Sequence, residues 1–132
     1  MDTELKTFKF EPEFEGIDEL YRFLMENIDF IDKKTGIRIG EEGLKARPFC
    51  ITGKENITER QILFYASKNT LPEDIGEMIV LASTFQTDII VFIVEKINPT
   101  ILEPMNWLSS ALNADTELIL AEAKIKKRLK AV

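Results

Sequence analysis

The first residues of the chain alternate between apolar and charged positions, and a helical period then replaces this alternation. Phe8 and Phe10 are separated by a lysine and followed by a glutamate, which predicts a short strand over residues 5–10. Pro12 cannot donate to a sheet ladder, so the strand is expected to end there or to lie at a sheet edge. The apolar positions that follow recur at helical spacing, which predicts a helix over 17–28.

Three further strands are predicted in the next stretch, over residues 29–39, 47–52 and 60–66. The first contains a turn at 34–36 (Lys-Thr-Gly), and the segment 53–56 (Gly-Lys-Glu-Asn) is typical of a hairpin loop. Because short turns join these strands, we expect them to pair in the antiparallel sense.

A helix with a capping box begins the second half of the chain. In residues 70–73 (Thr-Leu-Pro-Glu) a threonine hydroxyl and a glutamate three positions later satisfy each other's backbone amides. Proline in the first turn removes no helical hydrogen bond. We expect the helix to end near Gln86, with an apolar stripe formed by Ile75, Met78, Ile79, Ala82 and Phe85.

The run 89–94 is apolar at every position, as expected for a central strand that is covered on both faces. Asn98-Pro99 opens a helical segment, and Pro104 is expected to limit its regular part to residues 103–112. A further strand is predicted over 116–121.

The basic segment 123–132 is expected to form a terminal helix with Ile125 and Leu129 facing inward. The predicted order of elements is α-β-β-β-α-β-α-β. Its later strand–helix–strand units imply parallel pairing with right-handed crossovers. We therefore predict the α/β class, with a mixed central sheet flanked by helices, in a single domain over 1–132.

Composition narrows the chemistry that this domain can perform. The chain has 132 residues, no histidine and one cysteine, Cys50. These counts exclude a Ser-His-Asp triad, a Cys-His pair, histidine metal sites, an internal disulfide and a cysteine-rich zinc knuckle. We expect Cys50 to be a buried thiol, and Trp107 to pack in the core or in an interface, with base stacking as the alternative.

The first ten residues have no apolar core of a signal peptide. The longest apolar run, over 89–94, has six residues, whereas a membrane span needs about 20. The expectation is a cytoplasmic protein with no membrane partner.

Charge is unevenly distributed. The total is −6, but residues 123–132 hold five cations and no acid, so the other 122 residues hold 12 basic and 23 acidic groups, a net −11. The five cations are Lys124, Lys126, Lys127, Arg128 and Lys130. Two interpretations stay open: a solvated helix that needs no partner, or a contact for nucleic acid or an acidic protein surface.

Short motifs in the second half are similar to those of a known superfamily. Ile75-Gly76 lies at the start of a helix, the apolar run 89–94 follows, and Asn106-Trp107-Leu108 lies in a later helix. Together with the order of elements, these motifs over residues 17–122 resemble the restriction-endonuclease-like, or PD-(D/E)XK, nuclease fold.

The resemblance implies where catalytic groups would stand. In that superfamily an Asp on the second strand and the Glu of a Glu-x-Lys on the third hold a divalent metal that activates water, and the Lys orients or polarises. Glu and Lys are two apart because residues i and i+2 of a strand share a face. Here the Asp position falls at Cys50 or Thr52 and the Glu position at Phe64 or Ala66, and none is acidic. The resemblance thus implies a degenerate site that holds no cofactor.

Displaced carboxylates are the alternative. Glu42 precedes the second strand, Lys68 follows the third, and Glu77 stands next to Gly76 in the first turns of the following helix. If these three groups meet in one cleft, they form a rebuilt Mg²⁺ site. Otherwise they are surface charges.

Three functional hypotheses follow. The leading one is a nuclease-like domain that has lost metal-dependent catalysis and acts as a binding or assembly module, with a second copy of the chain as an expected partner. The second is an active Mg²⁺-dependent nuclease with displaced carboxylates. The third is a protein-interaction domain with no nucleic-acid role.

Overall fold

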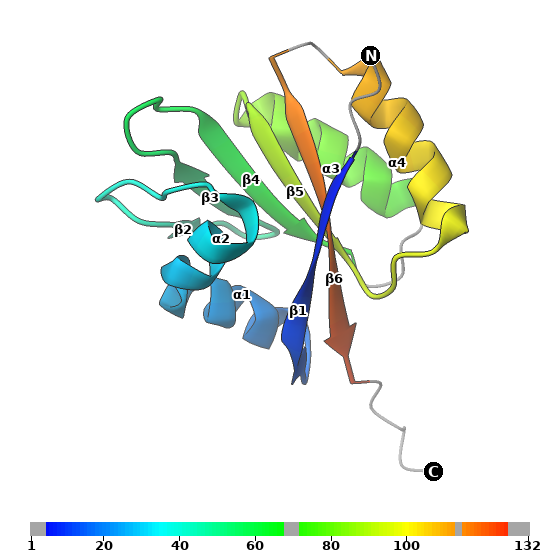
Figure 1. Cartoon of the computed structure of the whole chain (residues 1–132), viewed down its shortest axis with the longest axis horizontal. Helices are drawn as coiled ribbons and strands as arrows, with labels where there is room; N and C mark the ends of the chain where they lie inside the picture. The colour runs from blue at the N-terminus through cyan, green and yellow to red at the C-terminus, as the bar shows by residue number, and fades with distance from the viewer. Residues whose placement is uncertain (1–4, 68–71, 113–114, 127–132) are drawn as a thin grey trace.

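Six strands form one sheet in the computed structural model, which describes residues 5–67, 72–112 and 115–126 (Figure 1). The strands are β1 (Lys6–Phe14), β2 (Lys45–Ala46), β3 (Ile51–Lys54), β4 (Gln61–Ala66), β5 (Ile89–Val94) and β6 (Glu117–Ile125). The helices in the described residues are α1 (Ile17–Glu26), α2 (Ile28–Thr35), α3 (Pro72–Thr84) and α4 (Pro99–Ala111). Across the sheet the strand order is β1-β6-β5-β4-β3-β2.

The sheet has an antiparallel and a parallel part. β2, β3 and β4 are antiparallel neighbours, whereas β4, β5, β6 and β1 are parallel neighbours. The predicted α/β class and mixed sheet are therefore confirmed, as are the two modes of pairing. The predicted order of elements is not confirmed, because the structure runs β-α-α-β-β-β-α-β-α-β over the described residues.

Helices cover both faces of the sheet. α1 and α2 lie on one face, and α3 and α4 lie on the other (Figure 1). In β4, Ile62 and Phe64 belong to the core on the α1 side, whereas Leu63 and Tyr65 belong to the core on the α3 side. This alternation follows from the two-residue period of a strand. β5 is buried at every position, which confirms the predicted central strand.

The predicted strand over 29–39 is wrong, because α2 occupies most of it. Gly36 ends this helix in the left-handed region at φ 75°, and its N–H donates to the Asp32 carbonyl at 2.8 Å. The ring of Phe30 stacks on Phe10 of β1 with 5.1 Å between centroids. Tertiary packing against β1 therefore stabilises a helix of only two turns.

Two strand boundaries also differ from prediction. The strand predicted over 47–52 begins at Ile51, since Pro48 and Phe49 lie in the preceding loop. At the other end of the chain, the predicted terminal helix is wrong for residues 123–125, which continue β6 and pair with β1. Leu129 lies outside the described residues. Pro12 lies in the edge strand β1 where its register with β6 shifts, as the missing N–H requires.

The two long helices follow the predicted pattern only in part. α4 begins after the Asn98 cap and runs through Pro104, so that proline does not limit the helix to 103–112. In α3, Met78 is buried but Ile79 is 46% exposed and does not belong to the core. Trp107 is 72% exposed, so it does not pack in the core. Among the described helices, none has the length and apolar character needed to cross a membrane.

Candidate functional site

The first candidate site is a hollow of about 560 Å³ at the end of β4, which we call the Tyr21 cleft. Its walls come from α1, from the loop before β3, from the end of β4 and from the first turns of α3. Its polar lining includes Asp18, Tyr21, Tyr65, Asp74 and Glu77. This is the place where the nuclease resemblance would put its catalytic groups.

Tyr21 joins three elements at the bottom of this cleft. Its hydroxyl accepts a hydrogen bond from the Ala66 N–H at 2.9 Å and donates to the Phe49 carbonyl at 3.1 Å. Burial raises the pKa of Tyr21 to about 12, so the hydroxyl stays protonated at neutral pH. The phenol thus provides a hydrogen-bond partner for a backbone N–H at the end of β4, and it connects α1 to the loop before β3.

The strand positions that would carry metal ligands are not acidic. Cys50 and Thr52 are buried near and within β3, and Phe64 and Ala66 are buried within β4. Burial raises the pKa of the Cys50 thiol, which opposes thiolate formation and leaves a weak nucleophile. The prediction of a buried cysteine is confirmed.

Two of the carboxylates that line the Tyr21 cleft, Asp74 and Glu77, interact with neighbouring hydroxyl groups. The Ser67 hydroxyl donates to the Asp74 carboxylate at 2.6 Å. Burial, together with the charges of Glu77 and Asp74, raises the pKa of Tyr65, so that phenol is also neutral. Within the described ranges, no group of three or more His, Cys, Asp or Glu side chains is arranged to hold a metal ion. The donor set therefore does not fit a divalent cation.

The structure does not bring the predicted carboxylates together. Glu77 lines the Tyr21 cleft, whereas Glu42 lines a different hollow beside Gly40 and Lys54. The Glu42 carboxylate is exposed and lies 3.9 Å from the Lys45 ammonium. The third predicted group, Lys68, lies outside the described residues.

The basic residues near the end of the chain separate into two environments. Lys124 lines a second hollow, described below. Lys126 pairs with Glu15 at 3.1 Å, and this hydrogen bond and charge raise the pKa of Lys126. The other three cations of this segment lie outside the described residues: Lys127, Arg128 and Lys130.

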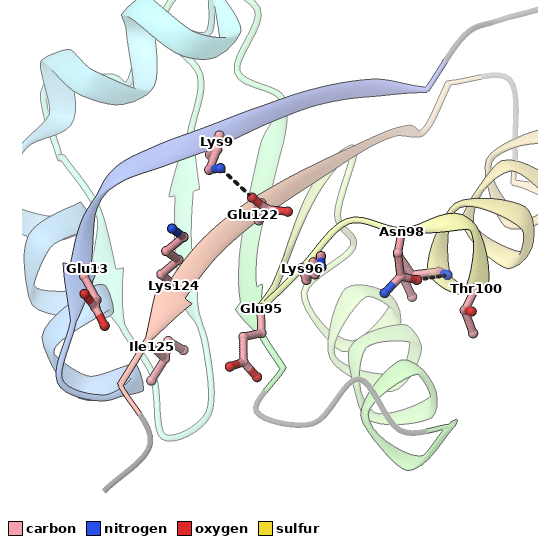
Figure 2. A pocket seen from close by; sticks show the side chains of 10 residues that line it. Lys9, Glu13, Glu95, Lys96, Asn98, Thr100, Glu122, Lys124 and Ile125 are labelled. Atoms are coloured by element: carbon pink, nitrogen blue, oxygen red, sulfur yellow. Dashed lines mark hydrogen bonds and ion pairs between the residues drawn. The ribbon is translucent and has the colours of Figure 1, made fainter.

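The second candidate site is a hollow of about 920 Å³, which we call the carboxyl-end hollow (Figure 2). β1 and β6 supply its floor, and the 95–98 loop with the first turn of α4 supplies its wall. Its polar lining consists of Lys9, Glu13, Glu95, Lys96, Asn98, Thr100, Glu122 and Lys124. It is larger than the Tyr21 cleft and draws on three separate segments of the chain, within residues 9–13, 95–101 and 122–125.

Glu122 is held firmly in the floor of this hollow. Its carboxylate accepts the Ile97 N–H at 2.8 Å and lies 3.1 Å from the Lys9 ammonium (Figure 2). The Ile97 N–H first, and Lys9 second, lower the pKa of Glu122 below its usual range. One lysine and one backbone donor thus neutralise this carboxylate.

The topology explains why a hollow forms here. β1, β6 and β5 are parallel, so their carboxyl ends lie at one edge of the sheet. The chain leaves β1 for α1 on one face and leaves β5 for α4 on the opposite face, with β6 between them (Figure 1). Open α/β sheets bind ligands at such a point, where the connections diverge.

Sequence reasoning missed the carboxyl-end hollow. Glu95-Lys96 directly follows the predicted central strand, and this was the available signal, because polar groups after a parallel strand lie at the carboxyl edge. The contribution of Lys9 had no such signal, since it comes from a strand more than 100 residues away from Glu122 in the sequence.

Comparisons of this chain with protein-family models, with curated proteins and with solved structures find no match.

Proposed function

We propose that this chain is a binding module on a restriction-endonuclease-like sheet, and that it does not catalyse metal-dependent nucleic-acid cleavage. Support for the likeness comes from the segment between α1 and β5. There, α1 and α2 precede β2, β3 and β4, which pair in the antiparallel sense. α3 then leads to β5, which is parallel to β4.

The observation that supports the loss of catalysis is the set of possible metal ligands at the end of β4. A divalent cation in a phosphoryl-transfer site needs carboxylate oxygens to hold it and to balance its charge. β4, from Gln61 to Ala66, contains no carboxylate, and its backbone at Ala66 is already bonded to Tyr21. A metal at the end of this strand would find no anionic ligand on the strand.

The proposal is tested by a cleavage assay with the full chain. Supercoiled plasmid, single-stranded DNA and RNA are incubated with Mg²⁺ or Mn²⁺, and products are resolved on gels. We expect no cleavage above a protein-free control. Metal-dependent cleavage that Glu77→Gln abolishes and Glu103→Gln preserves would overturn the proposal, because Glu103 is an exposed α4 carboxylate outside the Tyr21 cleft.

The same assay separates the proposal from the alternative of an active nuclease with displaced carboxylates. That alternative needs Glu42 or Glu77 to converge with Lys68 at one metal site. Self-association, nucleic-acid contact by residues 124–130 and a cytoplasmic location stay predictions, to be checked by light scattering, salt-dependent binding and cell fractionation.

A further inference from the structure

We infer that the carboxyl-end hollow binds a small organic phosphate. The inference rests on the proposed function, because it names a ligand class and a site for the binding module. Three features of the hollow carry it: its size and position, the balance of its charges, and the donors on its wall.

Size and position suit a metabolite. Small-molecule sites are typically hollows of about 300–1,000 Å³, and this one measures about 920 Å³. It opens at the carboxyl ends of parallel strands, where the connections from β1 and β5 diverge to opposite faces of the sheet. Residues from strands, a loop and a helix converge there, so a ligand would contact segments that the core already holds in place.

The charges of the hollow leave two ammonium groups for a ligand. Lys9 pairs with Glu122, whose carboxylate is also bonded to a backbone N–H. Within the described ranges, neither Lys96 nor Lys124 forms an ion pair, although the charge of Lys96 contributes to lowering the pKa of Glu122. Lys124 stands two residues after Glu122 on β6 and therefore on the same face of the sheet, whereas Lys96 belongs to the wall.

The other two carboxylates of the lining stand close to these lysines along the backbone: Glu13 faces Lys124 across the β1–β6 pair, and Glu95 precedes Lys96 in the chain. Figure 2 shows the side chains of Glu13 and Glu95 directed away from the Lys124 ammonium, which extends toward Lys9. The charge of Glu13 acts on Lys126, whose pKa is raised first by Glu15 and further by Glu13. The Lys124 ammonium therefore lies on the Lys9 side of the hollow, in a lining that holds three lysines and three glutamates.

The wall adds neutral donors to the two cations. Asn98 Oδ1 accepts the Ile101 N–H at 3.3 Å, and Figure 2 shows the amide nitrogen of Asn98 on the side of the hollow. Thr100 contributes a hydroxyl from the first turn of α4. Two ammonium groups, an amide NH₂ and a hydroxyl together match the several oxygens and the double charge of a phosphate monoester.

The probes are inorganic phosphate and glycerol 3-phosphate, titrated into the full chain by calorimetry and followed by amide NMR shifts. We expect saturable one-site binding, with shifts concentrated at residues 95–100 and 122–125. Lys124→Gln and Lys96→Gln should each weaken binding about tenfold, since each removes a charge-assisted contact. Lys96→Arg should retain affinity, because it retains the charge.

The matched control is Lys45→Gln, which removes an exposed lysine that lies outside the hollow and pairs with Glu42. Unchanged affinity in this variant supports the inference. The inference fails if no saturable binding occurs, or if Lys45→Gln weakens binding as much as Lys124→Gln. Neither failure affects the proposed loss of catalysis, which is measured separately by the cleavage assay.

Discussion

Replacing Tyr21 by phenylalanine removes one oxygen atom from the protein and leaves the ring. The hydroxyl makes two hydrogen bonds, one from the Ala66 N–H at 2.9 Å and one to the Phe49 carbonyl at 3.1 Å. Ala66 is only 6% exposed, so we expect its N–H to be poorly hydrated once its partner is removed. An unsatisfied buried donor costs about 1–3 kcal/mol, and we expect Tyr21→Phe to lower the free energy of unfolding by about 2 kcal/mol.

Urea denaturation monitored by circular dichroism measures this loss. With an m-value of about 2 kcal/mol/M, the midpoint should fall by about 1 M while m stays constant. Tyr65→Phe is the matched control. It removes a hydroxyl that is hydrogen-bonded to the Glu77 carboxylate, and that carboxylate is exposed and stays hydrated. Its expected loss is below about 1 kcal/mol. Equal midpoints for Tyr21→Phe and the unmodified protein would refute the role given to this hydroxyl.

The same residue predicts an alkaline limit to stability. The pKa of Tyr21 is about 12 in the folded chain because burial opposes ionisation, whereas an unfolded tyrosine titrates near about 10. A group whose pKa is raised on folding contributes stability below the unfolded value and loses it as the pH rises through the folded value. Stability should therefore fall between about pH 10 and pH 12, and Tyr21→Phe should flatten that fall.

Three further predictions concern other parts of the chain. Gly36→Ala places a side chain at φ 75° with open space around it, so we expect a loss of about 1 kcal/mol in thermal unfolding from backbone strain alone; a neutral result would contradict the helix cap. Phe10→Ala removes a fully buried ring that stacks on Phe30, and a loss of about 3–5 kcal/mol in urea is expected; less than about 1 kcal/mol would place the ring outside the core. The lowered pKa of Glu122 adds stability that is lost as the pH falls below about 4.3. Glu122→Gln should therefore weaken the acid dependence of the unfolding midpoint, whereas an unchanged profile would argue against the contacts with Ile97 and Lys9.

Hydrophobic patterns in the sequence predicted the structure correctly where buried positions repeat along one helix or strand. β5 is apolar at six consecutive positions, and a run this short and this rich in β-branched residues favours a strand covered on both faces. The antiparallel and parallel halves of the sheet likewise followed from the lengths of the connections, because a short turn and a helical crossover permit different pairings.

Sequence patterns gave wrong predictions where the same pattern is compatible with both a helix and a strand. α2 has only eight residues, and its Phe30 and Ile31 both pack against the core, so no clear helical period emerges. The end of β6 alternates Ala123 and Ile125 with Glu122 and Lys124, which is a strand pattern that the high local charge concealed. Pairing with β1 decides this segment, and that partner lies more than 100 residues earlier.

Some features of the candidate sites can likewise be predicted from the sequence, and others cannot. The sequence shows that β4 has no acidic residue at the motif positions, because the fixed spacing of the motif specifies which strand positions should be acidic. The hydrogen bonds of Tyr21 and the charge balance around Glu122 depend on contacts between distant segments. Sequence periodicity carries no information on such contacts.

Titration of the full chain with Mn²⁺, followed by electron paramagnetic resonance of the free ion, tests the central claim most directly. A binding module without a metal-carboxylate site should leave Mn²⁺ free at equimolar and micromolar concentrations, and Glu77→Gln should change nothing. One tightly bound Mn²⁺ per chain, lost in Glu77→Gln and kept in Glu103→Gln, would contradict the account and restore metal-dependent chemistry to the Tyr21 cleft.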